Sequence, residues 1–538
     1  MIRNEIKKQI CAAAGMFILI ILSVACEDFN ELNTPPDEIV AENVDGSLLG
    51  QAFAFAQMSS FFGEGNNYQA AYSHYGNAYS QYKATIHPNF DMDQLEVANR
   101  HMILINNNYY ENTAPQLQFV ENYSAENGLP VVNAMAKIWR VVAYHRMTDL
   151  YGPVIYSQFG NGETSVAYDA QEDIYMDFFQ TLDEAIAVLE QNRGGNAFGS
   201  HDQMYAGNVD QWILFANSLR LRLATRVVYV EPELAEQEAE KAIAGGIITG
   251  NSDNAELVTT INSENPLSSI TYHDEFRMSA TLHSVLVGWN DPRLPVYLAE
   301  VWNGGGYKGL RNGLPADQKD RTFLTNNYSA VGNRWRPLFS GPWGEGGVNA
   351  PVEVLLAAEV YFLRAEGALR GWDMGGGTAE EYYNEGIRMS LSQDRIGASA
   401  AEIEDYITGT DLPVGIDDPW GTPPMTDIPV LYQPGAGFEK QLEQIITQKW
   451  LALFPEGIEA WTERRRTGYP VGYAVINSIN PNIPVTGLVR RQKYSSEEYS
   501  NNAVAVEAAL DLLGGPDGDH IRVWWDKKPL GDYPTPTQ

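Results

Sequence analysis

Apolar residues recur at helical spacing along most of the chain. Ile174, Phe178, Leu182, Ala185 and Leu189 follow one another at intervals of three or four residues, which predicts a helix with one buried face. Similar patterns predict helices over 130–151, 212–228, 234–244, 352–369, 442–454 and 457–466. Alternation typical of strands is sparse and short, so the sequence predicts a mainly α-helical protein.

Helices with short connections also indicate helical hairpins. Ala379, Tyr383 and Gly386 have the spacing of small, aromatic and small positions in the second helix of a tetratricopeptide repeat, and the helix before them would be its partner. We therefore expect a core of divergent hairpins of this type, an α-α superhelix. Two long irregular regions, about 250–350 and 411–437, are predicted to form a loop-rich, ligand-binding face.

The N-terminus has the pattern of an export signal. Basic residues in the first eight positions precede an apolar run from 10 to 25, which is shorter than the roughly 20 residues of a membrane-spanning helix. Small residues then lead to Cys26, as a lipoprotein signal requires. We predict a signal peptide over 1–25, a lipid on Cys26, an acidic tether over 26–43 and one domain over 44–538.

Charge and cysteine content narrow the possible partners. The 69 acidic and 36 basic side chains give a net charge of −33, which argues against nucleic acid as a partner. Removal of 1–25 leaves 68 acidic and 33 basic groups, a net charge of −35. It also removes Cys11, so the mature protein would keep only Cys26 and would have no thiol chemistry.

Several motifs resemble metal-binding or cofactor-binding sites, but the residues around them do not fit such sites. The eight histidines include no pair at helical ligand spacing. Residues 304–309 spell G-x-G-x-x-G, but the segment after them cannot open a helix. Asn89, Asp91 and Asp93 imitate the start of a calcium loop, yet Gln94 and Arg100 stand where it needs glycine and glutamate. We therefore predict no metal, no cofactor and no catalytic residue. For 89–93 we expect a solvated acidic turn, with an isolated ion site as the alternative.

Three consecutive arginines end the predicted helix over 457–466. They resemble an anion site, but the helix dipole and nearby carboxylates account for them more simply. We expect their role to be structural.

Aromatic residues give the strongest indication of a ligand. Five tyrosines between Tyr68 and Tyr82 lie at spacings of three and four, and the first three are expected in the core. Tryptophans in the irregular region are not explained by helical packing. Flat rings stack on sugars while amide and guanidinium groups bind hydroxyls. The candidate ligand-binding residues are Tyr79, Gln81, Tyr82, Asn89, Trp302, Trp335, Arg336 and Trp343.

Several segments, in order along the chain, resemble the SusD-like (SusD/RagB) family. The matching segments are 26–36, 148–157, 291–297, 359–372, 382–390, 448–454, 459–470 and 524–526. The resemblance implies a helical, tetratricopeptide-like protein without catalytic activity. It also implies a lipid-anchored outer-membrane protein, exposed on the cell surface, that captures oligosaccharides for a SusC-like TonB-dependent transporter. Glu27 and Asp28 resemble the family's export cue, and 79–90 and 289–343 resemble its binding face.

Other functions stay open at this point. Some members of the family bind peptides, so a peptide receptor for the same type of transporter is one alternative. The 68 acidic residues of the mature chain would also allow a carboxylate pair, so a surface glycoside hydrolase is another. A purely helical scaffold that binds the transporter and no small ligand is the third.

Overall fold

The computed structural model describes residues 46–63, 65–96, 98–260, 263–336, 349–475, 477–484 and 487–529. The predicted signal peptide, Cys26, the tether and Trp343 lie outside these residues. Contacts divide the chain into two units, 1–49 and 50–538, and the second holds nearly all of the described fold. Within the described ranges, no helix is both long and apolar enough to span a bilayer.

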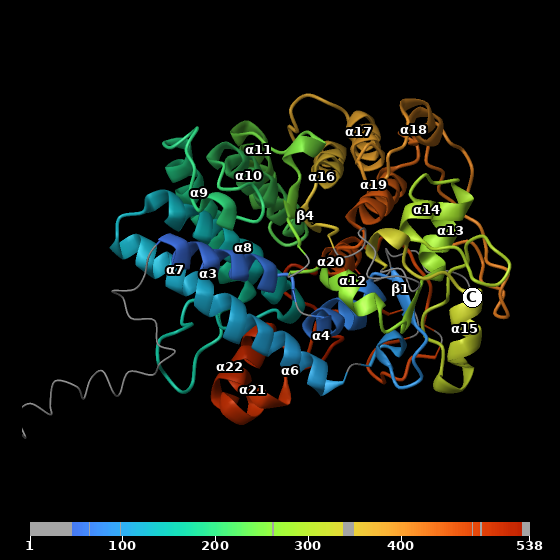
Figure 1. The fold of residues 1–538 in the computed structure, drawn as a ribbon, viewed down its shortest axis with the longest axis horizontal. Coiled ribbons are helices and arrows are strands. Elements are labelled where there is room, and N and C mark those ends of the chain that lie inside the picture. Colours follow the sequence, from blue (N-terminus) through green and yellow to red (C-terminus); the bar gives the residue numbers. More distant parts are fainter. Residues whose placement is uncertain are drawn as a thin grey trace, which may run out of the picture. The chain divides into compact units, whose positions relative to one another are not determined.

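Successive antiparallel helices form the first part of this unit, and each packs against the next (Figure 1). They are α7 (Ala114–Glu126), α8 (Pro130–Tyr151), α9 (Gln171–Glu190), α10 (Val209–Arg226) and α11 (Pro232–Gly245). Helix α8 has the predicted bounds because Pro130 suits a first helical turn and Gly152 ends the helix with φ 84°. The predicted helical stripes of α9, α10 and α11 are confirmed.

A second group of helices packs beside α10. It comprises α16 (Ala357–Arg370), α17 (Ala379–Leu391), α18 (Ala400–Ile407), α19 (Phe438–Leu453) and α20 (Gly457–Thr467). Helices α16 and α17 form the predicted hairpin. A capping box of Thr378 and Glu381 starts α17, and Gly386 lies against the ring of Phe362. The mainly α-helical prediction is therefore confirmed.

One predicted helix starts in the wrong place. We expected a helix over 352–369, but β4 (Val352–Leu355) is a strand that pairs with β2 (Ala255–Leu257). All four residues of β4 are buried. A short run of buried apolar residues has no period that separates a strand from a helix, which explains the error.

The region 250–350 is built of short elements instead of open loops. Helices α12 (Pro266–Thr271), α13 (Ala280–Gly288), α14 (Leu294–Tyr297) and α15 (Arg321–Asn327) lie here. Strand β3 (Phe276–Met278) pairs antiparallel with β1 (Lys83–Thr85), so distant parts of the chain meet. Residues 411–437, by contrast, contain no helix or strand, as expected.

The tyrosine segment begins with α4 (Gly65–Tyr68), continues as a π-helix (Gln69–Gly76) and ends in α5 (Asn77–Tyr79). The π-helix and α5 both pack against α20. Tyr68, Tyr72 and Tyr75 are buried, which confirms their expected place in the core. Further helices are α3 (Gly46–Ser59), α6 (Asn99–Asn107), a π-helix (Asn108–Thr113), α21 (Ser496–Asn501) and α22 (Ala503–Leu513).

The arginines of α20 belong to a buried ionic network. Arg466 pairs with Glu366 and Glu463, while Arg465 donates to the backbone carbonyls of Asp149 and Arg490. All the groups concerned are buried. These contacts confirm the structural role predicted for the three arginines.

Candidate ligand-binding site

Three of the predicted stacking residues lie in the core. The Tyr82 hydroxyl donates to the carbonyl of Trp450, and the two rings stack with centroids 5.0 Å apart. The ring of Tyr79 packs on Trp461 at 5.3 Å. Trp335 has no exposed surface and packs on Phe454 at 5.2 Å. The prediction of stacking platforms at Tyr79, Tyr82 and Trp335 disagrees with these positions, because none of the three rings presents a face to solvent.

Gln81 also has a role inside the fold. Its amide nitrogen donates to the carbonyl of Tyr473 at 2.6 Å, and its amide oxygen accepts from Tyr473 N–H at 2.8 Å and from the Thr281 hydroxyl at 2.6 Å. Its φ of 58° holds the chain in the left-handed region. Gln81 therefore joins two segments of the fold, and it is buried with both atoms of its side-chain amide already hydrogen-bonded.

The remaining predicted residues are not gathered at one place. Trp302 is 86% exposed, and Arg336 is half-buried beside a small cavity that Lys83 also lines. Burial lowers the pKa of Arg336, and the nearby Asp274 opposes this shift. Asn89 is exposed and lines a much larger cleft. Trp343 lies outside the described residues.

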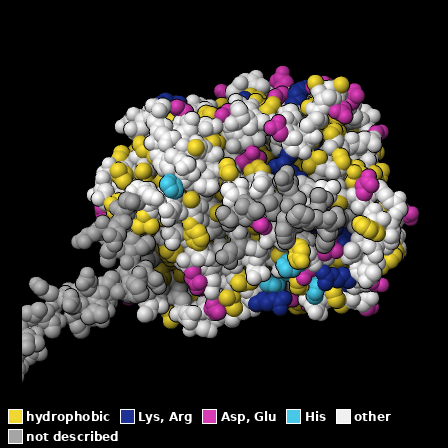
Figure 2. Space-filling view, in the orientation of Figure 1, with side chains coloured by type: hydrophobic (Ala, Val, Ile, Leu, Met, Phe, Trp, Pro, Cys, Tyr) yellow, Lys and Arg dark blue, Asp and Glu magenta, His cyan; other side chains and the backbone are white. Residues whose placement is uncertain are grey.

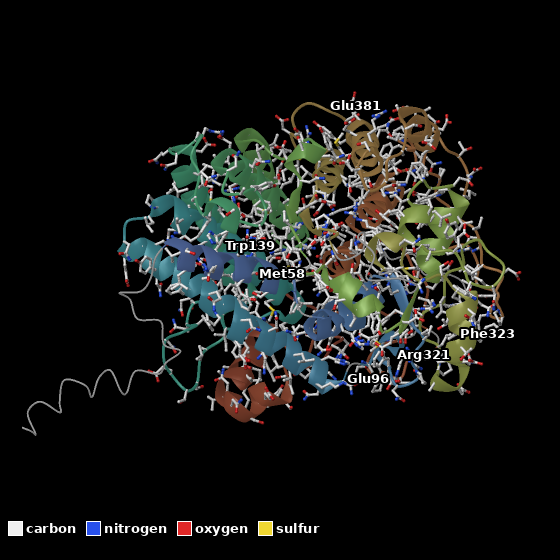
Figure 3. The ribbon with its side chains drawn as sticks, in the orientation of Figure 1. Met58, Glu96, Trp139, Arg321, Phe323 and Glu381 are labelled. Carbon is white, nitrogen blue, oxygen red and sulfur yellow. The ribbon has the colours of Figure 1, made fainter. Side chains whose placement is uncertain are left out.

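That larger cleft has a volume of about 670 Å³. Residues 89–92 and the N-terminal part of α6 (Asn99–Asn107) line one side, while residues 493–499 and Asp517 line the other. We call it the α6 cleft. Figure 3 labels one of its lining residues, Glu96, near α6. Its volume is in the range of small-molecule sites, which is 300 to 1,000 Å³ in order of magnitude.

An aromatic cluster lies at the inner side of the cleft. Phe90 packs on His87, His74 and Phe276, with ring centroids 4.4, 4.7 and 6.2 Å apart. His101, which lines the cleft with Phe90, stacks on His74 at 4.0 Å. His87, Phe90 and Phe276 are only half-buried, so this cluster retains exposed ring surface. Sequence reasoning missed it because its members come from four separate segments.

Burial keeps the imidazoles of His74 and His101 uncharged. Burial, with a smaller contribution from the neighbouring Arg100, lowers the pKa of His101 to about 4. Burial and then His101 place the pKa of His74 well below its ordinary value. Arg100 Nε donates to His101 Nε2 at 3.1 Å, which fixes that nitrogen as the acceptor. At neutral pH His74 and His101 therefore add uncharged aromatic rings to the cluster.

The rim of the cleft is polar, and most of its charges are paired. Lys493 lies 3.8 Å from Glu96, and Asp517 is held by Arg491. Arg100 is exposed and, among the described residues, has no carboxylate partner. Figure 2 shows Lys, Arg and His side chains gathered on the face where Figure 3 labels Glu96 and Arg321. The cleft thus combines ring surface, amides and one available guanidinium, which suits a polar ligand of low charge.

The segment that imitates a calcium loop has another explanation. Asp93 is buried, accepts a hydrogen bond from Thr85 N–H and lies 3.3 Å from Lys319 Nζ. Its carboxylate is therefore used inside the fold. In the part of the chain that the structure describes, no group of three or more His, Cys, Asp or Glu side chains is placed to hold a metal ion.

Comparison with known families settles what kind of protein this is. The family model described as "Susd and RagB outer membrane lipoprotein" matches residues 31–526. The chain belongs to the SusD-like family. The SusD-like fold agrees with the helical architecture described above, and the family is one of outer-membrane lipoproteins.

Solved structures of SusD homologues superpose on nearly the whole chain. A chitin-binding homologue from Flavobacterium johnsoniae is 34% identical, with a TM-score of 0.82 over 89% of this chain and 98% of that one. A homologue from Bacteroides uniformis is 33% identical, with a TM-score of 0.81 over 90% and 100%. One from Bacteroides thetaiotaomicron is 33% identical, with a TM-score of 0.79 over 91% and 100%. No protein of curated function matches the sequence.

Proposed function

We propose that this SusD-like protein is a non-catalytic glycan-binding lipoprotein, anchored through Cys26 and exposed on the cell surface. It delivers oligosaccharides to a SusC-like TonB-dependent transporter in the outer membrane. The observation that carries the proposal is the α6 cleft, where the exposed ring surface of the Phe90 cluster lies beside polar side chains.

The chemistry of the cleft fits a sugar. A pyranose has an apolar face that stacks on an aromatic ring and an edge of hydroxyls that need hydrogen-bond partners. Phe90 supplies the ring, while Arg100 and Asn89 supply donors and, at Asn89, an acceptor. Because Glu96, Lys493 and Asp517 are already in ion pairs, a neutral oligosaccharide would bind without leaving these ions uncompensated.

The relative from Flavobacterium johnsoniae supports a glycan as the ligand and indicates which glycans to test first. It binds chitin and is 34% identical over most of both chains, so chito-oligosaccharides are the first ligands to test here. Trp302, with its exposed ring, would be a further contact for a longer oligosaccharide. Arg336 and Trp343 also remain proposed contacts.

Isothermal titration calorimetry tests the site. Chitotetraose, cellotetraose and maltotetraose are titrated into the purified mature protein and into Phe90→Ala and Arg100→Ala. We expect at least one of these sugars to bind and each variant to weaken it about tenfold or more, equivalent to about 1.4 kcal/mol. Phe438→Ala is the matched control, because this exposed phenylalanine does not line the cleft. Unchanged binding in folded Phe90→Ala and Arg100→Ala would refute the site.

The same preparation distinguishes the other functions. Steady release of reducing sugar by the pure protein would identify a glycoside hydrolase instead. Peptides in material eluted from protein purified from its own cells, with no response to any sugar, would identify a peptide receptor. A barrel transporter that co-purifies while neither sugar nor peptide binds would identify a helical scaffold.

The anchor and the transporter need separate experiments. Mass spectrometry of the mature N-terminus should find Cys26 as the first residue and lipid-modified. Cys26→Ser should shift the protein from the membrane fraction to the soluble fraction. Purification from native outer membranes should retain a TonB-dependent barrel, and its absence under mild detergent conditions would contradict the delivery role.

A further inference from the structure

A second cavity, of about 520 Å³, lies beside α3 and shares no lining residue with the α6 cleft. Phe55 and Met58 of α3 line it, together with Asn112 of the π-helix over Asn108–Thr113. Ser263, Glu264, Ser269 and Gln203 also line it. Figure 3 labels Met58 on α3. We call this cavity the α3 pocket.

One aromatic ring that lines this pocket, Phe55, packs on no other ring among the described residues. On the same helix Phe53 is fully buried and contacts Trp139 and Phe198, whereas Phe55 is 49% exposed. Neighbouring positions of a helix point in different directions, so Phe55 lies off the face that forms the core. Half of a large apolar side chain is thus left accessible in a concave site.

Some polar side chains of the pocket are used within the fold. The Asn108 amide donates to the Ser59 carbonyl at 2.9 Å and accepts from Asn67 at 3.0 Å. The Ser59 hydroxyl accepts from Thr113 at 2.9 Å, and the Gln203 amide donates to the His201 carbonyl at 3.1 Å. Across the described ranges, four other lining side chains make no hydrogen bond or ion pair. They are Asn112, Ser263, Glu264 and Ser269.

Charge restricts the ligand. Among the described residues that line the pocket there is no Lys, Arg or His, and Glu264 is the one charged group. An anionic sugar would meet a carboxylate without a compensating cation and would be repelled. A neutral sugar would donate its hydroxyls to Glu264, Ser269 and the Asn112 oxygen while its apolar face packs on Phe55.

We infer that the α3 pocket is a second binding site for a neutral saccharide unit, separate from the α6 cleft. The inference rests on the proposed glycan-binding function for the class of ligand, but it does not depend on the location of the first site. Two sites on one protein would let it hold a long glycan at two points or retain two oligosaccharides at once. The effective concentration at the second site would then raise the affinity for long chains above that for short ones.

The test combines stoichiometry with a readout that locates the sugar. Chitotetraose, cellotetraose and maltotetraose are titrated at up to millimolar concentration, with tetragalacturonate as the anionic comparison. Hydrogen–deuterium exchange is measured with and without each sugar. We expect two equivalents of neutral sugar to bind, with slower exchange in peptides from 54–63 and 108–113. Tetragalacturonate should leave those peptides unchanged.

Variants separate this inference from the proposed function. Phe55→Ser and Asn112→Ala should each remove one equivalent and abolish the protection of 54–63, while Phe90→Ala should remove the other equivalent. Val504→Ala, at a site 77% exposed on α22, should change neither. One equivalent that is lost in Phe90→Ala but intact in both α3-pocket variants would overturn this inference and leave the proposed function standing. Two equivalents that persist in folded Phe90→Ala would overturn the α6 cleft instead.

Discussion

Arg466 donates two hydrogen bonds, 2.7 and 2.6 Å long, to the carboxylate of Glu366, which lies 100 positions earlier in the chain. Both side chains are buried, and the pair joins α16 to α20. Burial acts to raise the pKa of Glu366, but Arg466 and Arg370 outweigh it and hold that pKa well below its ordinary range. The ion pair is therefore intact throughout the neutral range of pH.

Glu366→Gln should destabilise the protein, because it leaves Arg466 with a buried charge that only Glu463 then compensates. We expect a loss of about 3 to 5 kcal/mol in the free energy of unfolding, measured by urea denaturation at pH 7. Glu236→Gln, an exposed carboxylate on α11, is the control and should change it by less than about 0.5 kcal/mol.

The same ion pair predicts how the stability of the protein changes at acidic pH. Because the pKa of Glu366 is lower in the folded state, its contribution is complete above the unfolded-state pKa of about 4.3 and is lost as pH falls below it. The stability difference between the protein and Glu366→Gln should therefore be constant from pH 7 to 5 and shrink below pH 4. A difference that grows on acidification would contradict the assignment.

Lys83 is a buried amine on β1, and no carboxylate of the described residues pairs with it. Burial lowers its pKa from 10.5 to about 7. The unfolded chain holds the proton up to higher pH, so this group costs stability below pH 7 and the cost fades as pH rises towards 10. Lys83→Met should raise the urea midpoint at pH 7 by more than at pH 9.5. Lys527→Met, at an exposed position, should show no such pH dependence.

Trp335 and Trp302 should respond in opposite ways to truncation. Trp335 is fully buried between Tyr297 and Phe454, so Trp335→Ala should cost about 3 to 5 kcal/mol of stability by leaving a large cavity. Trp302 is 86% exposed, so Trp302→Ala should leave the unfolding midpoint unchanged. Urea denaturation of both variants is the measurement. A stable Trp335→Ala would show that its ring is not part of the core.

Gly386 allows α17 to approach α16 closely. A Cβ atom at this position would lie 2.8 Å from ring atoms of the buried Phe362. Gly386→Val should therefore destabilise the protein by about 1 to 3 kcal/mol, because the two helices must separate. Gly435→Val is the matched control, since nothing lies within 4 Å of its added Cβ. Equal unfolding midpoints for the two variants would contradict the close packing.

A helix could be predicted from the sequence where its apolar residues recur at helical spacing and where residues such as proline and glycine mark its two ends. Pro130 and Gly152 bound α8, and a clean apolar stripe identifies α9. The strand at 352–355 was not predictable, because its pairing with β2 depends on a segment almost 100 residues away. Long-range pairing leaves no mark in the local pattern of apolar residues.

The candidate site was less predictable than the fold. Asn89, a predicted contact, lines the α6 cleft, whereas Trp335 was expected to face a ligand because its segment has no helical period. A loop without a period can still turn its rings inward, so exposure does not follow from irregular sequence. The stack of His74 on His101 was missed because the two residues belong to different helices, the π-helix and α6. Their proximity is a product of tertiary packing alone.

The two hydrogen bonds between Gln81 and Tyr473 join a segment that is synthesised early to one that is synthesised late. These residues are 392 positions apart, so the segment beside β1 emerges long before its partner exists. At about 5 to 20 residues per second, the ribosome needs roughly 20 to 80 s to make the intervening chain. During that time the rings of Tyr79 and Tyr82 lack Trp450 and Trp461 to cover them. A chaperone that binds the nascent or translocating chain would therefore find exposed aromatic rings in this segment.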